Sequence, residues 1–166
     1  GFLPAREQFD AIVGVARSRG LYLFSDEMYR WLEPDPARRL PAVCDVYEKG
    51  ITLSGLSKAF ALPGLRLGWL AAREAGLLER WQAFKDYTTI CHSAPSEVLG
   101  LIALRARQTI LARNLKIIQA NLAHMEAFCA DHPQLFRAGA TSPKPWPRCG
   151  RTCAAHGWPS ATFVQP

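Results

Sequence analysis

The chain has 166 residues, the length of one ordinary domain, and 49% of them are hydrophobic, which is enough for a sizeable core. No apolar run approaches the roughly 18 residues that cross a membrane, and the chain opens without a signal-peptide pattern. The net charge is +6, but the residues from Arg137 onward carry four basic side chains and no acidic one, which leaves +2 for the rest. Neither a membrane nor a nucleic acid is therefore expected as a partner.

The first part of the chain predicts one helix followed by three short strands. Residues 3–19 carry an apolar stripe at helical spacing, and Gly20 is expected to end that helix. The stripe consists of Phe9, Ile12, Val13 and Ala16. Short apolar runs predict buried strands at 21–24, 51–54 and 67–71. This alternation indicates an α/β fold, in which ligands bind at the carboxyl ends of strands, close to Asp26 and Lys58.

The second part of the chain predicts helices. Residues 74–87 form one, a second begins near 93–97 with a proline in its first turn, and 107–130 form a long amphipathic helix. From Arg137 to Pro166 the chain has five prolines, no acidic residue and no helical or strand period. We expect this tail to be disordered, either as a native basic segment or as the product of a reading-frame change near Phe136.

The five cysteines are odd in number and irregularly spaced, so they predict no disulfide framework. Cys44, Cys91 and Cys129 have apolar neighbours in the sequence and are expected to be buried thiols. Cys149 and Cys153 with a nearby histidine make an incomplete ligand set, so no metal site is expected. This usage indicates a reducing, cytoplasmic setting.

The most informative stretch of the chain is 55–68. Its one lysine, Lys58, follows small residues at the end of a predicted strand, and Arg66 lies eight residues further on with glycines around both. A lysine that attacks a carbonyl must first lose its charge, small residues let the backbone approach a planar ligand, and an arginine offers a planar fork to a phosphate. The pattern also fits a solvated surface lysine and arginine, and spacing alone favours that explanation.

Beyond its spacing, the stretch 55–68 resembles the pyridoxal-phosphate (PLP) attachment signature of class I aminotransferases: Gly or Ser, two residues, the Schiff-base lysine, then arginine and a small residue. Residues 25–29 (Ser-Asp-Glu-Met-Tyr) resemble the Asp-Glu-x-Tyr segment of the same class I/II family, and 93–97 with the long helix resemble its continuation. The resemblance covers about 1–136. It implies an α/β fold, namely part of the fold type I large domain, with a mostly parallel sheet flanked by helices.

The resemblance implies a role for each matching position. Asp26 would pair with the pyridine nitrogen of PLP and keep it protonated, and Tyr29 would donate to the phenolic oxygen of the ring. Lys58 would hold the cofactor as a Schiff base and then act as general base and acid. Arg66 would bind the phosphate, and Ser57 would assist it. Without the resemblance, Asp26 would be interpreted as a turn aspartate and Tyr29 as a half-buried aromatic.

Position 55 departs from the signature of some relatives, and His92 has no counterpart in it. Some relatives have a serine three residues before the lysine, where its hydroxyl contacts the phosphate, and here that residue is Gly55. Ser54 or Ser57 would have to supply the hydroxyl instead. His92 is expected to be a loop histidine without a catalytic role.

By the same resemblance, 1–106 would be a partial PLP-binding large domain, 107–136 an interdomain helix with the start of a truncated small domain, and 137–166 the tail. The implied activity transfers an amino group between an amino acid and a 2-oxo acid, in a homodimer. A lyase or cyclase of the same fold and a non-catalytic truncated remnant remain alternatives. The chain has no initiator Met, and nothing before Leu3 supplies a glycine-rich phosphate turn. We therefore expect a fragment that is inactive alone.

Overall fold

The computed structural model describes residues 3–133, 136–137 and 148–149 of the chain. The chain divides into two compact units, one formed by residues 4–116 and the other by Leu3 with the described residues from 117 onward. Among the described residues, no helix is long and apolar enough to cross a membrane.

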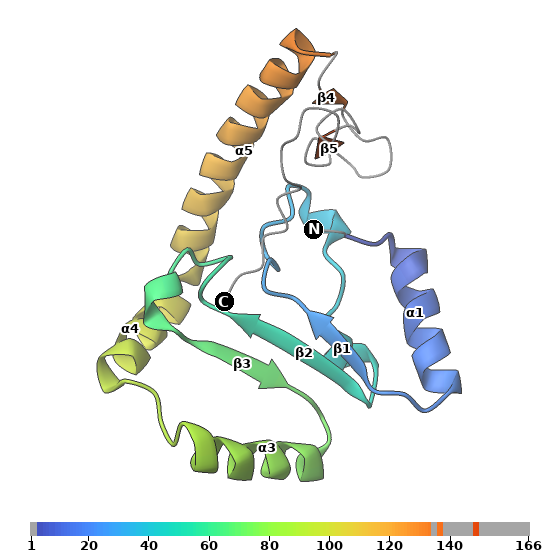
Figure 1. Cartoon of the computed structure of the whole chain (residues 1–166), viewed down its shortest axis with the longest axis vertical. Helices are drawn as coiled ribbons and strands as arrows, with labels where there is room; N and C mark the ends of the chain where they lie inside the picture. The colour runs from blue at the N-terminus through green and yellow to red at the C-terminus, as the bar shows by residue number, and fades with distance from the viewer. Residues whose placement is uncertain (1–2, 134–135, 138–147, 150–166) are drawn as a thin grey trace, which may run out of the picture. The chain divides into compact units, whose positions relative to one another are not determined.

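The first unit is built on a three-stranded sheet in the order β1 (Leu23–Asp26), β2 (Gly50–Gly55) and β3 (Gly68–Ala71) (Figure 1). β1 pairs with β2 in parallel, and β3 pairs with β2 in the antiparallel sense, so the described sheet is mixed. Helices flank these strands, which confirms the predicted α/β class. The strands predicted at 51–54 and 67–71 are β2 and β3.

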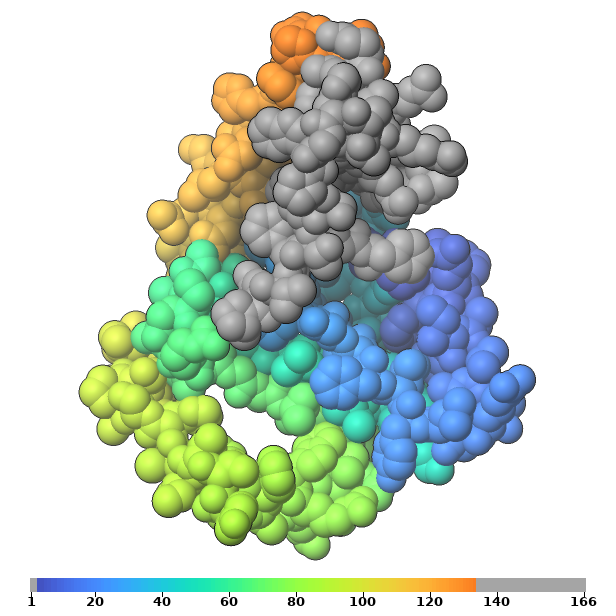
Figure 2. Space-filling view, viewed as in Figure 1, coloured from blue at the N-terminus to red at the C-terminus, as the bar shows by residue number. Residues whose placement is uncertain are grey.

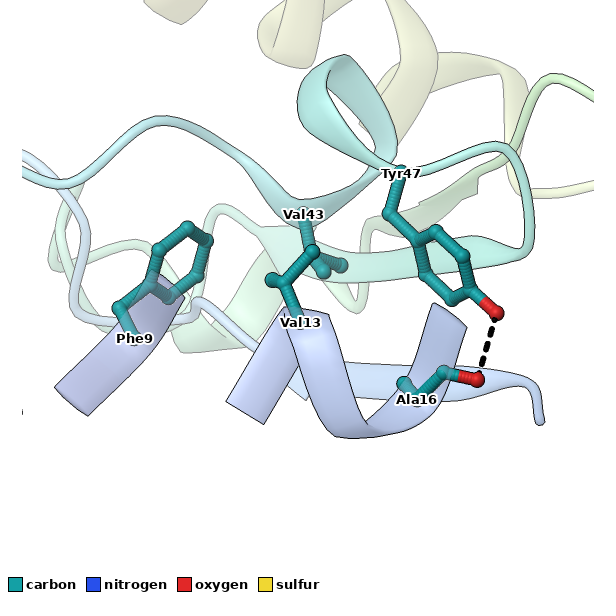
Figure 3. Packing of buried hydrophobic residues seen from close by; sticks show 5 residues of the cluster. All are labelled: Phe9, Val13, Ala16, Val43 and Tyr47. Carbon is teal, nitrogen blue, oxygen red and sulfur yellow. Dashed lines mark hydrogen bonds between the residues drawn. The ribbon is translucent and has the colours of Figure 1, made fainter. Parts of the chain in front are cut away.

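Helix α1 (Arg6–Ser18) packs against the short helix α2 (Val43–Val46). Their shared cluster of buried side chains consists of Phe9, Val13, Ala16, Val43 and Tyr47 (Figure 3). The single O–H of Tyr47 is shared between two acceptors, the carbonyl oxygens of Leu21 at 2.6 Å and Ala16 at 3.1 Å. This satisfies the one polar side-chain atom of a residue that is 1% exposed. Ile12, expected in the apolar stripe, is instead exposed, because the buried face follows the spacing of Phe9, Val13 and Ala16.

The strand predicted at 21–24 begins two residues later than expected. Gly20 has a φ of 64° and ends α1, as predicted. The N–H of Gly20 donates to Arg17 O and that of Leu21 to Ala16 O, the two hydrogen bonds of a Schellman motif. Because the cap occupies the N–H of Leu21, pairing with β2 starts at Leu23.

The remaining elements of the first unit are the 3₁₀ turns η1 (Pro36–Arg38) and η2 (Pro63–Leu65) and the helices α3 (Ala75–Thr88) and α4 (Ala94–Arg105). Both helices were predicted, and Ser93 is the N-cap of α4, with proline in the first turn. α3 has no buried residue, and Figure 2 shows an opening between it and the sheet.

Helix α5 (Arg107–Asp131) confirms the predicted long helix and continues from the first unit into the second. Within the second unit, β4 (Phe136–Arg137) pairs in the antiparallel sense with β5 (Arg148–Cys149). Apart from these two short strands, the predicted tail at 137–166 lies outside the described residues, as do Cys153 and His156. The predicted domain boundaries stay predictions.

The expected burial of the cysteines was wrong for Cys91, which is exposed, whereas Cys44 and Cys129 are half-buried. Cys91 lies in the turn after α3, where its N–H donates to Thr89 O and the preceding Ile90 has a φ of 57°. Ile90 is itself 71% exposed, so apolar sequence neighbours did not imply a buried position.

Candidate active site

The sheet brings the predicted site residues to one of its edges. The parallel strands β1 and β2 both end there, at Asp26 and Gly55. The antiparallel β3 begins at the same edge, because its first residue, Gly68, lies opposite Gly55. Lys58 follows β2 and Arg66 precedes β3, so both belong to the segment that connects these strands across this edge.

Asp26 is the last residue of β1 and its side chain is exposed. One carboxylate oxygen, Oδ1, accepts a hydrogen bond of 3.0 Å from the N–H of Met28, which makes the start of the following turn an Asx turn. The turn interpretation of Asp26 is therefore correct at the level of local structure. This turn hydrogen bond leaves the second carboxylate oxygen of Asp26, Oδ2, available to a ligand.

Tyr29 lies in the turn after β1 and is 63% exposed, so its interpretation as a half-buried aromatic was wrong. The turn is closed by hydrogen bonds from the N–H of Arg30 to Glu27 O and from the N–H of Leu32 to Tyr29 O, at 3.0 and 3.1 Å. The phenol projects from a backbone that is held on both sides.

Glu27 holds this turn in place, and sequence reasoning gave it no role. Its side chain is only 10% exposed. Oε1 accepts hydrogen bonds from the N–H of Val43 at 2.9 Å and from Thr52 Oγ1 at 3.1 Å, and Oε2 pairs with Arg30 at 3.1 Å. Since Val43 is the first residue of α2 and Thr52 lies in β2, one carboxylate ties the turn to two other elements. The alternation of side chains along a strand could have indicated that Glu27 points inward, because it places Glu27 on the face opposite the exposed Asp26.

Lys58 lies in a tight turn directly after β2, and both Lys58 and Ser57 are half-buried. The N–H of Leu62 donates to Leu56 O at 2.9 Å, and the N–H of Ala61 donates to Lys58 O at 3.0 Å. Buried apolar side chains on either side of Lys58 anchor the turn; they are Leu56, Ala59 and Phe60. The backbone that carries Lys58 is thus fixed by hydrogen bonds and by packing.

The structure explains why position 55 is a glycine. A Cβ atom added to Gly55 would lie 2.9 Å from the Cα of Gly68 and 2.9 Å from the carbonyl oxygen of Leu67, both backbone atoms of the neighbouring segment. No side chain fits there without moving β3. A serine at this position would require a different spacing of β2 and β3.

Arg66 has a φ of 53° and lies in the left-handed region, where a residue other than glycine is strained. Its N–H and its Nη1 both donate to Pro63 O, at 3.3 and 3.1 Å, so the side chain caps its own turn. The guanidinium is exposed and has further donors for an anion. Ala61, in the Lys58 turn, also has a positive φ of 55°.

His92 is exposed in the loop between α3 and α4. Within the part of the chain that the structure describes, no group of three or more His, Cys, Asp or Glu side chains is placed to hold a metal ion.

The fold and this edge define an α/β domain with a lysine, a carboxylate and an arginine gathered where strands end. Comparison with known proteins identifies it further. The family model "Aminotransferase class I and II" matches residues 1–141, and the chain belongs to that family. The predicted resemblance is therefore confirmed, and the match extends five residues beyond the predicted limit of 136.

Two curated relatives illustrate the match. The chain is 34% identical over 106 residues to an aspartate aminotransferase of Musicola paradisiaca, which is 63% of this chain and 26% of the relative. It is 31% identical over 93 residues to the aromatic-amino-acid aminotransferase 2 of Thermococcus litoralis, which is 55% of this chain and 24% of the relative. The chain thus spans about a quarter of the length of these relatives.

Solved structures agree with the fold type I assignment. A PLP-dependent aminotransferase from Streptococcus suis superposes with a TM-score of 0.73 at 34% identity, over 81% of this chain and 34% of that one. The PLP-dependent cyclase OrfR superposes with a TM-score of 0.79 over 95% of this chain and 41% of that one. At 23% identity, the second match shows the fold alone.

Proposed function

We propose that this chain supplies the lysine-bearing part of a PLP-dependent aminotransferase, which transfers an amino group between an amino acid and a 2-oxo acid. The observation that carries the proposal is the convergence of Asp26, Lys58 and Arg66 at one sheet edge in a chain of this family. When bound, PLP supplies an electron sink for the carbanion that forms at the substrate.

The donor set at this edge fits that cofactor. A phosphate needs a cation, a pyridinium nitrogen needs a carboxylate, and an aldehyde needs an amine. Arg66 has an exposed guanidinium, Asp26 an exposed carboxylate, and Lys58 a half-buried amine on a fixed turn. Because Arg66 and Asp26 are exposed, both are accessible to a ligand that carries one aromatic ring and several charges.

Each residue then has one task. Lys58 Nζ would hold the cofactor through its amine and, when free of it, would accept and return the proton of the substrate. Asp26 would keep the pyridine nitrogen protonated, and Tyr29 would donate to the phenolic oxygen of the ring. Arg66 would bind the phosphate, and the hydroxyl of Ser57, in the Lys58 turn, would assist it.

The substrates, the homodimer and the cytoplasmic location belong to the same proposal. The support for a reducing compartment is the odd number and irregular spacing of the five cysteines in the sequence. The chain alone is proposed to be inactive, since it spans about a quarter of its relatives and exposes Asp26, Tyr29 and Arg66. A cyclase or lyase of the same fold is the second candidate, because Lys58 and Asp26 would serve that chemistry equally well.

Borohydride trapping tests the proposal in the full-length polypeptide that carries this sequence. Reduction with PLP present should fix the cofactor on the peptide that contains Lys58, and Lys58→Ala should abolish that adduct. Lys49→Ala is the control, because Lys49 is a surface lysine whose Nζ donates to Gly20 O. An adduct that persists on another lysine in Lys58→Ala would overturn the site. Turnover of an amino acid with a 2-oxo acid, against elimination or cyclisation of the same donor, separates the two activities.

A further inference from the structure

A buried asparagine on α5 contacts the turn that carries Lys58. Asn114 is only 7% exposed, and it is one of two buried polar residues, with Thr52, in the described part of the chain. Its Nδ2 donates a hydrogen bond of 2.9 Å to the carbonyl oxygen of Ala59, the residue directly after Lys58. The two partners are 55 positions apart in the sequence.

The same helix also packs on this turn. Leu111, three residues before Asn114 and therefore on the same helix face, is buried against Leu56, Ala59 and Phe60. Apolar packing restrains where these side chains lie but is not directional. The hydrogen bond from Asn114 adds a direction, because it fixes the orientation of the peptide group between Ala59 and Phe60.

Fixing that peptide group also fixes Lys58. The turn closes on itself through hydrogen bonds from Ala61 N–H to Lys58 O and from Leu62 N–H to Leu56 O. Ala59 lies inside this closure, so rotation of its carbonyl would disturb both hydrogen bonds. Ala61 has a strained positive φ, and such a conformation persists only where the surroundings hold it.

We propose that Asn114 is a positioning residue for Lys58: it locks the turn so that Nζ is presented to the cofactor in a single geometry. This inference rests on the proposed function. Replacing Asn114 by leucine removes the donor while keeping a similar volume. Because small misplacements of a reacting group are costly, covalent attachment of PLP to Lys58 should slow on the order of 10- to 100-fold.

The test measures the rate at which the borohydride-reducible PLP adduct forms on Lys58 in the full-length polypeptide. Asn114→Leu should form it slowly while remaining folded. Asn121→Leu is the matched control, since it makes the same substitution at an exposed position of the same helix. Val13→Ala controls for lost stability, because it weakens the separate cluster of α1 and α2. Both controls should keep the wild-type rate.

A second measurement needs no cofactor. In Asn114→Ser, whose shorter side chain does not reach Ala59 O, hydrogen exchange at the amides of Ala61 and Leu62 should accelerate, while the β1–β2 amides stay protected. A wild-type rate in folded Asn114→Leu, an equal slowing in Val13→Ala, or unchanged exchange in Asn114→Ser would each overturn the inference. Absence of any Lys58 adduct in the wild type would instead overturn the proposed function.

Discussion

Replacing Glu27 by alanine should cost this fold about 3 kcal/mol of unfolding free energy. The carboxylate is 10% exposed and accepts from Val43 N–H and Thr52 Oγ1 while pairing with Arg30 at 3.1 Å. Breaking a buried ion pair by removing one partner costs about 3–5 kcal/mol, and the lower end applies because Arg30 is itself 21% exposed. Arg30 retains Leu40 O as an acceptor, which also limits the loss.

Urea unfolding followed by circular dichroism measures this difference. The matched control is Asp10→Ala, which breaks the i,i+4 pair with Arg6, where both side chains are more than half exposed. That pair should contribute less than about 0.5 kcal/mol. If Glu27→Ala and Asp10→Ala differ by less than about 1 kcal/mol, Glu27 does not hold the turn, and the explanation given for the position of Tyr29 is wrong.

Three further outcomes follow from single contacts. Gly55→Ala should lose about 1–3 kcal/mol in the same urea assay, because its Cβ meets backbone atoms, whereas Gly64→Ala, with nothing within 4 Å, should not. The hydrogen bond to Glu74 raises the pKa of Tyr22 above its ordinary value of 10.0. The stability that this hydrogen bond contributes is therefore fully present below pH 10.0 and is lost as the pH rises through the raised pKa. Thermal unfolding should therefore depend less on alkaline pH in Tyr22→Phe; equal curves would refute the link. Asp26→Asn should leave stability within about 0.5 kcal/mol but cut the turnover of the full-length protein by orders of magnitude, and near-normal turnover would exclude the proposed role.

Local patterns predicted most elements of the first unit. The apolar runs of β2 and β3 and the stripes of the helices are features of neighbouring residues, so they can be recognised in sequence. The start of β1 was missed because Leu21 has strand-forming neighbours but its N–H is used by the cap of α1. Cys91 was missed because its burial depends on what packs over the turn after α3, which local composition does not encode.

The candidate site was predictable to the extent that a motif defines it. Lys58, Arg66 and Asp26 lie in short stretches with a recognisable order, and strand order then places them at one edge. Asn114 was not predictable in this way, because its partner is 55 residues away and a lone asparagine in an amphipathic helix has no local signature. The need for glycine at position 55 was not predictable either, because it depends on how closely β2 and β3 approach each other.

The polar residues at this edge fall into two groups by burial. Asp26, Tyr29 and Arg66 are exposed, so their side chains contribute little to folding and are accessible to a ligand. Asn114 is buried and the side chain of Glu27 is only 10% exposed, and each holds the backbone beside one of the residues proposed to act on the cofactor. Because a buried polar group must keep its hydrogen bonds, these two restrain their turns more strongly than apolar packing alone would. The geometry of the proposed site therefore depends on residues that would not contact the cofactor, and substitutions there should alter stability and function together.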